Sequence, residues 1–333
     1  MNFKTYPPLS APDERPAWEK LAYSTGQADP FCSAPTWQMA FHDAFGPQRR
    51  LLIHSASDSF IAFAEHVNHP SEIFLTPIEM HWCFGCPLLG ENAVALLQEA
   101  LPAIEELAAP STVNMLISGI QPGSPLSQQL TRRFAEDFDI YLHSSSVQAA
   151  SSLEGGVDGY LSRRSANHRK KLRRQARRAA DIGVGFERVS PTTTEECDAV
   201  YARMLAVERT SWKGIGKCGM AEPGAKEFYD FMLKRLSTTS SARVVFARHE
   251  GMDIGFIFGG MVGKVYRGQQ FSYDDGWKKR SIGNIMQLEK IKWLCEEGAA
   301  RYDMGPVSGP KMGYKSHWIE KRSIIQSWVF AKR

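Results

Sequence analysis

The sequence predicts an α/β (α+β) protein of two domains, and three observations support this. The chain has 333 residues, which is longer than one typical domain and shorter than three. In the first half, strand patterns alternate with helix patterns, as in an α/β domain. In the second half, neighbouring strand patterns at 242–249, 254–262 and 263–273 are joined by Gly251 and Gly263, which predicts an antiparallel meander.

The composition is that of an ordinary globular chain. Hydrophobic residues make up 43% and charged residues 23% of the sequence, so disorder is not indicated. No apolar run approaches the roughly 20 residues of a membrane helix, and the first residues lack the apolar core of a signal peptide. A cytoplasmic protein with no membrane span is therefore expected. Six scattered cysteines do not form a disulfide scaffold and are expected to be reduced.

The first half begins with an extended lead-in over residues 1–16, which are rich in proline and polar side chains. The elements expected after it are helices at 17–25, 35–45, 91–108 and 125–138, and strands at 50–54, 59–66, 113–117 and 140–147. The segment 149–156, AASSLEGG, is small and polar and predicts a domain boundary. The predicted domains are therefore 1–148 and 149–333.

The second half contains a glycine-rich loop at 214–224 among regular elements. Five helices are expected there: 158–162, a basic helix at 165–182, one from the Thr192–Thr194 run to about 209, one at 225–236 and one from about 281 to Gly298. Besides the meander, the expected strands are 184–189, 300–304 and 322–331. Ser165 or Asn167 is the expected cap of the basic helix.

The basic helix concentrates the positive charge of the chain. Nine Lys or Arg and no acid lie between Arg163 and Arg178, so the remainder holds 31 bases (40 minus 9) against 36 acids, or −5. A solvated face is the simplest interpretation, and a membrane anchor would need large apolar residues that are absent. The partners that remain open are an RNA, the acidic helix of a phosphopantetheine carrier, and a phosphorylated donor.

A candidate anion site lies where the helix at 281 begins. Lys278, Lys279 and Arg280 precede Ser281-Ile282-Gly283-Asn284, and the first N–H groups of a helix attract anions. Gly283 would let a ligand approach the backbone. The simpler alternative is a turn capped by Ser281. The predicted cofactor-binding residues here are Lys279, Arg280, Ser281, Ile282, Gly283 and Asn284.

This order of features resembles the GNAT acyltransferase superfamily. The resemblance consists of a basic loop with Arg280-x-x-Gly283, an amphipathic helix, then Tyr302-Asp303-Met304-Gly305 and Tyr314-Lys315. It is closest to the FemAB-like branch, which includes CelD-type proteins, and covers residues 155–331. It implies two GNAT-like domains, each a mixed, mostly antiparallel sheet flanked by helices. Where the usual GNAT loop has a second Gly or Ala, this chain has Ile285.

The resemblance and the residue types together suggest the catalytic groups. Tyr273, at a strand end, is a candidate proton donor for a leaving thiolate, and Asp303 a candidate base or anchor for the acceptor amine. Their simpler interpretations are strand packing and an ion-pair partner. Tyr314 is a third catalytic candidate, and Lys315, with Lys311, a candidate contact to a phosphate or carboxylate.

Five further residues are candidates for the acceptor site. Glu208, Trp212 and Lys213 join a helix end to the glycine-rich loop, which suggests a pocket wall beneath a lid. Arg267 and Gln269 are polar residues in a strand expected to be half buried. A packing role for Trp212 and a solvated face for the other two are the alternatives.

No metal site is expected. Cys83-x-x-Cys86 with His81 lacks the second ligand pair that a zinc site needs.

The function predicted is an N-acyltransferase that moves an acyl group from acyl-CoA or an acyl-carrier protein to a small-molecule or peptide amine by direct attack. One alternative is a Fem-type transferase that takes its acyl group from aminoacyl-tRNA, with the carrier protein or tRNA bound by the basic helix. Another is a module without catalysis that binds nucleic acid or anions.

Overall fold

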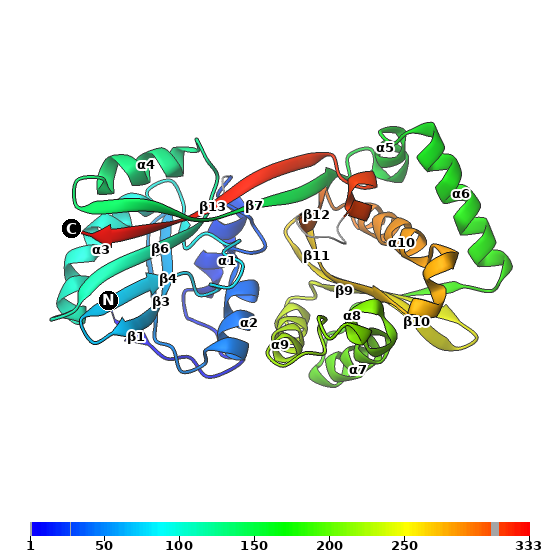
Figure 1. Cartoon of the computed structure of the whole chain (residues 1–333), viewed down its shortest axis with the longest axis horizontal. Helices are drawn as coiled ribbons and strands as arrows, with labels where there is room; N and C mark the ends of the chain where they lie inside the picture. Colours follow the sequence, from blue (N-terminus) through cyan, green and yellow to red (C-terminus); the bar gives the residue numbers. More distant parts are fainter. Residues whose placement is uncertain (1, 27, 308–312) are drawn as a thin grey trace. The chain divides into compact units, whose positions relative to one another are not determined.

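The computed structural model describes residues 2–26, 28–307 and 313–333, apart from the side chains of Asn68 and Tyr314. By its internal contacts the chain divides into two units. The first comprises Met1–Val147 with Ser323–Arg333, and the second comprises Gln148–Arg322. Each unit is a mixed, mostly antiparallel sheet flanked by helices, as predicted (Figure 1).

The first unit is built on the strand order β1-β2-β3-β4-β6-β13-β7. Its strands are β1 (Phe3–Lys4), β2 (Leu51–Ala56), β3 (Ser59–His69), β4 (Glu72–Thr76), β5 (Leu88–Leu89, paired with β3), β6 (Thr112–Ile120), most of β7 (Phe138–Ser152) and most of β13 (Lys321–Lys332). Its helices are α1 (Arg15–Ser24), α2 (Pro35–Phe45), α3 (Ala93–Ala108) and α4 (Pro125–Phe134). Strands β4 and β6 are parallel.

The second unit continues from the end of β7 in the order β7-β12-β11-β10-β9-β8. Its strands are β8 (Gly185–Val189), β9 (Ala242–His249), β10 (Met252–Val262), β11 (Val265–Tyr273) and β12 (Arg301–Pro306). Its helices are α5 (Gly156–Ser162), α6 (Ala166–Asp181), α7 (Thr194–Thr210), α8 (Trp212–Ile215), α9 (Ala225–Ser237), η1 (Asp275–Arg280), α10 (Ile282–Glu296) and η2 (Gly313–His317). The predicted meander of β9, β10 and β11 is confirmed.

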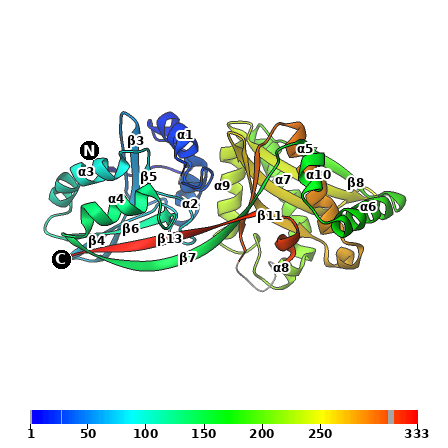
Figure 2. The ribbon, with the colours of Figure 1, turned by 90° about the horizontal axis from the view of Figure 1, so that it is seen from above.

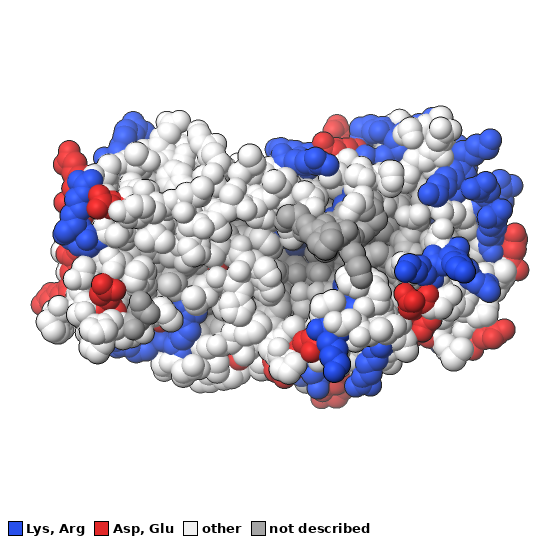
Figure 3. Space-filling view, viewed as in Figure 1, with Lys and Arg blue, Asp and Glu red and all other residues white. Residues whose placement is uncertain are grey.

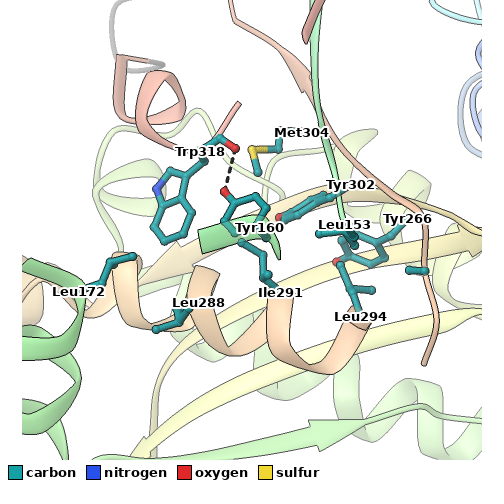
Figure 4. Close-up of a cluster of buried hydrophobic side chains, with 11 residues drawn as sticks. Leu153, Tyr160, Leu172, Tyr266, Leu288, Ile291, Leu294, Tyr302, Met304 and Trp318 are labelled. Atoms are coloured by element: carbon teal, nitrogen blue, oxygen red, sulfur yellow. Dashed lines mark hydrogen bonds between the residues drawn. The ribbon is translucent and has the colours of Figure 1, made fainter. Parts of the chain in front are cut away.

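Helices cover both faces of this second sheet. Figure 1 shows α5, α6 and α10 on one face and α7, α8 and α9 on the other. Helix α6 lies beside α10 in both views (Figures 1 and 2). Under α10, Tyr160 and Trp318 belong to a buried cluster in which the Tyr160 hydroxyl donates to the Trp318 carbonyl oxygen at 2.8 Å (Figure 4). This packing fixes α10 on the strands that carry the candidate site.

The predicted domain limits differ from the two units mainly at the C-terminus. The units meet at Val147 and Gln148, next to the predicted boundary between residues 148 and 149. At this boundary the chain is still in a strand, because Ala149, Ala150 and Ser151 are buried in β7 and pair with β12. Residues 323–333 group with the first unit, because β13 pairs with β6.

Some local features were also missed. Strands β1, β4 and β5 were not predicted. The expected loop 214–224 begins within a short helix, α8, which Ser211 caps by accepting from the N–H groups of Lys213 and Gly214.

Candidate functional site

Strands β11 and β12 run parallel but separate after a short paired stretch. Residues Val265–Arg267 pair with Arg301–Asp303, and in the described part of the chain the pairing of these two strands ends there. Strand β11 continues to Tyr273 beside β10, whereas β12 continues to Pro306 beside β7. The far half of β11 therefore has a strand neighbour on one side, and its other edge can bond an extended ligand.

A β-bulge marks the point where the strands separate. In the register with β10, Gln269 is the extra residue between Gly268 and Gln270. The opposite strand has Gly259 here, where a Cβ would lie 2.3 Å from the carbonyl oxygen of Arg267. Among the described residues, Nε2 of Gln269 is buried without a hydrogen-bond partner. Bulges redirect side chains and are frequent next to active sites, so Gln269 remains a predicted ligand contact.

Lys213 ties α8 to this edge of β11. Its Nζ donates to Oε1 of Gln270 at 2.7 Å and to the carbonyl oxygen of Phe271 at 2.9 Å. Gln270 in turn donates from Nε2 to the hydroxyl of Tyr229 at 2.6 Å. Burial lowers the pKa of the Lys213 ammonium, and Glu208 partly offsets this. Lys213 thus places its amino group beside the bulge.

Lys315 lies at the end of β12. It is 7% exposed, and its Nζ donates to the carbonyl oxygens of Met304 and Pro306 at 2.6 and 2.7 Å. Burial first, then Arg267 and Lys213, lower the pKa of Lys315 to about 7. A neutral amine has two N–H groups, which these two carbonyls accept, and one lone pair, which remains for a proton. Lys315 can therefore act as a base near neutral pH, which differs from the ligand-binding cation predicted from the sequence.

Arg267 and Asp303 lie opposite each other in the paired stretch of β11 and β12, and both are 2% exposed. Arg267 donates from Nη2 to Oε1 of Gln148 at 3.0 Å. Asp303 accepts through Oδ1 from Arg301, at 2.8 Å from Nε and 2.7 Å from Nη2. Arg301 is therefore an ion-pair partner of Asp303, as its simpler interpretation expects, and the catalytic role of Asp303 stays a prediction.

Bases and a left-handed residue precede α10. Lys278, Lys279 and Arg280 are exposed in η1. Ser281 follows with φ 58° and ψ 29°, and its side chain makes no capping hydrogen bond. A helical residue followed by a left-handed one turns successive N–H groups toward the same point, which suits an anion, and the helix start adds a positive field. The alternative of a turn capped by the Ser281 side chain is wrong.

The first turn of α10 packs more closely than a ligand loop requires. Ile282 is 1% exposed and belongs to the core. Asn284 donates from Nδ2 to Oε1 of Gln175 on α6 at 3.4 Å. A Cβ at Gly283 would lie 2.8 Å from Cζ of Phe271, so this glycine allows α10 to approach β11. Ile282 and Gly283 would therefore contact a ligand through their backbone N–H groups.

Tyr273 lies against the same turn. Its Cε1 would be 3.2 Å from a Cβ at Gly283, and its ring centroid is 5.8 Å from that of Phe271. Burial first, and then Asp275, raise the pKa of the Tyr273 hydroxyl. The hydroxyl is therefore protonated at neutral pH, and its role as a proton donor stays a prediction.

Glu208 has a structural role that the sequence did not indicate. It is 0% exposed; Oε1 accepts from the Met220 N–H at 3.0 Å and Oε2 from the Ser211 hydroxyl at 3.4 Å. It holds the loop against α7, so the prediction that it faces a substrate is wrong. Trp212 is half-buried at the start of α8, and its predicted contact with a substrate stays a prediction.

Lys311 and the side chain of Tyr314 lie outside the described residues, so their predicted roles are unchanged. Cys83 and Cys86 are free thiols, and the described residues hold no cluster of three metal-ligating side chains. None of the described helices is long and apolar enough to cross a membrane.

Two members of the site were not predicted. Gln148, which contacts Arg267, lies next to the predicted domain boundary, and Tyr229 occupies an ordinary core position of an amphipathic helix. No local pattern marks either residue, because each makes its contact with a strand distant in sequence.

Comparison with known proteins connects this geometry to a family. Residues 166–316 match the model of the acetyltransferase (GNAT) domain. The chain contains a GNAT domain. That match includes the separating strands, η1, α10 and Lys315. No functionally curated protein matches the sequence.

Solved structures extend the likeness to the whole chain. FemX is similar with a TM-score of 0.67 at 10% identity, covering 98% of this chain and 97% of FemX. A conserved protein of unknown function from Bacteroides thetaiotaomicron has a TM-score of 0.65 at 9% identity, covering 99% of each chain. L-PGS from Bacillus licheniformis has a TM-score of 0.59 at 13% identity, covering 99% of this chain and 94% of that one. The predicted resemblance to the GNAT superfamily is confirmed by the matching domain, and the fold shared with FemX is consistent with the predicted FemAB-like branch.

Proposed function

We propose that this protein is an N-acyltransferase that moves an acyl group from a thioester donor, acyl-CoA or an acyl-carrier protein, to an amine. The observation that carries the proposal is Lys315, a buried amine with a pKa of about 7 at the point where β11 and β12 have separated within the GNAT domain. The far half of β11 offers an edge for the extended arm of the donor. Lys279, Arg280 and the start of α10 would hold its phosphates.

The reaction follows from these positions. Lys315 removes a proton from the acceptor ammonium, and the free amine attacks the thioester carbonyl. A C–N bond forms and the C–S bond breaks. The leaving thiolate takes a proton from Tyr273, and the attacking nitrogen gives its second proton back to the tyrosinate, so the products are an amide and a thiol. Backbone N–H groups at the bulge would stabilise the oxyanion, and much of the rate enhancement would come from positioning the two reactants.

The alternative donor is an aminoacyl-tRNA, as in a Fem-type transferase. The fold shared with FemX and the basic face of α6 favour this alternative. A module without catalysis would bind anions at α10 but release no thiol.

The test is thiol release from acetyl-CoA and longer acyl-CoAs with a panel of amines, together with calorimetric binding of the donor. A mutation at Gly283 would disturb packing against Phe271, so the donor site is better tested by Lys279→Glu with Arg280→Glu, both exposed. We expect this pair to weaken acyl-CoA binding. Folded wild-type protein that binds and turns over no thioester would refute the proposal, and charged tRNA would be the next donor tested.

A further inference from the structure

Helix α6 presents one strongly cationic face. Six of its bases are exposed: Lys170, Lys171, Arg173, Arg174, Arg177 and Arg178. Leu172, Gln175 and Ala179 are buried on the opposite side. At 100° per residue the six bases occupy an arc of about 160°. Figure 3 shows Lys and Arg side chains gathered where Figure 1 draws α6.

These charges are not neutralised by the rest of the second unit. In the chain as described, the six bases form no ion pair, whereas Arg163 and Arg164, just before the helix, both pair with Glu320. Like charges this close repel one another, so a cationic face of this density is less stable alone than with an anion bound. An anionic partner is therefore expected for the face itself.

The cationic face adjoins the proposed donor site. Ala179 packs in the same cluster as Ile282, and Gln175 accepts from Asn284 at 3.4 Å, so the C-terminal half of α6 lies beside the start of α10. The exposed bases of η1 immediately precede that start. A partner on α6 would thus lie next to the point at which a donor phosphate is expected.

We propose that α6 and η1 dock a small acidic carrier protein whose prosthetic arm brings the thioester. The inference rests on the proposed function, because it names the form in which the donor arrives. The size of the partner follows from charge: outside residues 163–178 the chain carries 31 bases and 36 acids, a net −5, so a large polyanion such as a folded RNA would be repelled by the rest of the protein. The described residues of α6 expose no large apolar side chain for a membrane.

The experiment measures binding of hexanoyl-acyl-carrier protein and, separately, turnover of hexanoyl-CoA. The variant is Arg174→Glu with Arg177→Glu, both exposed and outside the catalytic residues. The matched control, Lys226→Glu with Lys264→Glu, makes the same change of charge at exposed positions elsewhere in the second unit. We expect the α6 variant to bind the carrier roughly tenfold more weakly, with turnover of hexanoyl-CoA unchanged, and carrier binding by the wild type to weaken between 50 and 200 mM salt.

The outcomes separate the inference from the function on which it rests. Equal carrier binding by the α6 variant and the control would overturn the docking surface. The docking surface would also be overturned if the wild type turned over hexanoyl-CoA but bound no carrier protein. In that case the proposed function stands. If the wild type bound a transfer RNA more tightly than the carrier protein, and the α6 variant but not the control lost that binding, the cationic face would be assigned to nucleic acid and the inference would be overturned. Wild type that accepts neither thioester would remove both proposals.

Discussion

Replacing Lys315 with methionine tests the proton acceptor directly, because methionine has a similar length and no titratable nitrogen. If Lys315 is the base, the rate follows its neutral fraction. With a pKa of about 7, that fraction is about one eleventh at pH 6 and ten elevenths at pH 8. We therefore expect the wild-type kcat to rise about tenfold between these pH values, and the variant to lose about 100-fold or more with no such rise.

The same pKa predicts how stability changes with pH. Lysine in the unfolded chain has a pKa near 10.4, whereas buried Lys315 has a pKa of about 7. Between these values the unfolded state binds more protons, so the free energy of unfolding increases with pH. Lys315 contributes about 1.4 kcal/mol per pH unit across this window and roughly 5 kcal/mol in all. Below about pH 7 its burial cost is fully present.

Urea denaturation of the wild type and of Lys315→Met at pH 7, 8 and 9 measures how the free energy of unfolding of each changes with pH. The wild type should become more stable relative to Lys315→Met at each step, and Lys264→Met, at an exposed position, is the matched control. A wild-type free energy of unfolding that changes with pH no more than that of Lys315→Met would refute the perturbed pKa. Full activity of Lys315→Met at pH 8 would refute the catalytic role.

Two further substitutions test the packing of the site. Gly283→Ala should destabilise the protein by about 1–3 kcal/mol in urea denaturation, because the added Cβ would lie 2.8 Å from Phe271. The control Gly185→Ala should be tolerated, because its Cβ would have no atom within 4 Å. Equal losses of stability in the two variants would contradict the close approach of α10 to β11. Glu208→Ala should leave the Met220 N–H without its acceptor and lower the free energy of unfolding by about 1–3 kcal/mol. Limited proteolysis of the loop 214–224 should then be faster than in the wild type. An unchanged rate of cleavage would show that Glu208 does not hold the loop.

Much of the second unit could be predicted because its signals are local. The order of basic residues, Ser281, Gly283 and an apolar periodicity predicts α10 and the candidate anion site. The Thr192–Thr194 run predicts the start of α7, where Thr193 and Glu196 form both hydrogen bonds of a capping box. Such signals depend on neighbours within a few residues, and the chain carries them whatever its tertiary structure.

The predictions that failed concern residues whose meaning depends on distant partners. Glu208 next to a glycine-rich loop has the same local pattern whether it faces a substrate or holds the loop; its contact with Met220 decides. The small, polar composition of 149–156 predicts a domain boundary, but it does not predict that Ala149 and Ala150 pair with β12 in a buried strand. Long-range pairing cannot be inferred from composition.

The sequence by itself determined most of the helices and strands, the cationic helix and the GNAT resemblance, because periodicity, capping and motif order are properties of short segments. The tertiary structure decided the chemistry of the site. The separation of β11 from β12 arises from how each strand pairs, and the pKa of Lys315 arises from burial together with Arg267 and Lys213, which are distant in sequence. Desolvation and charge act through space, and only the folded chain brings these groups together.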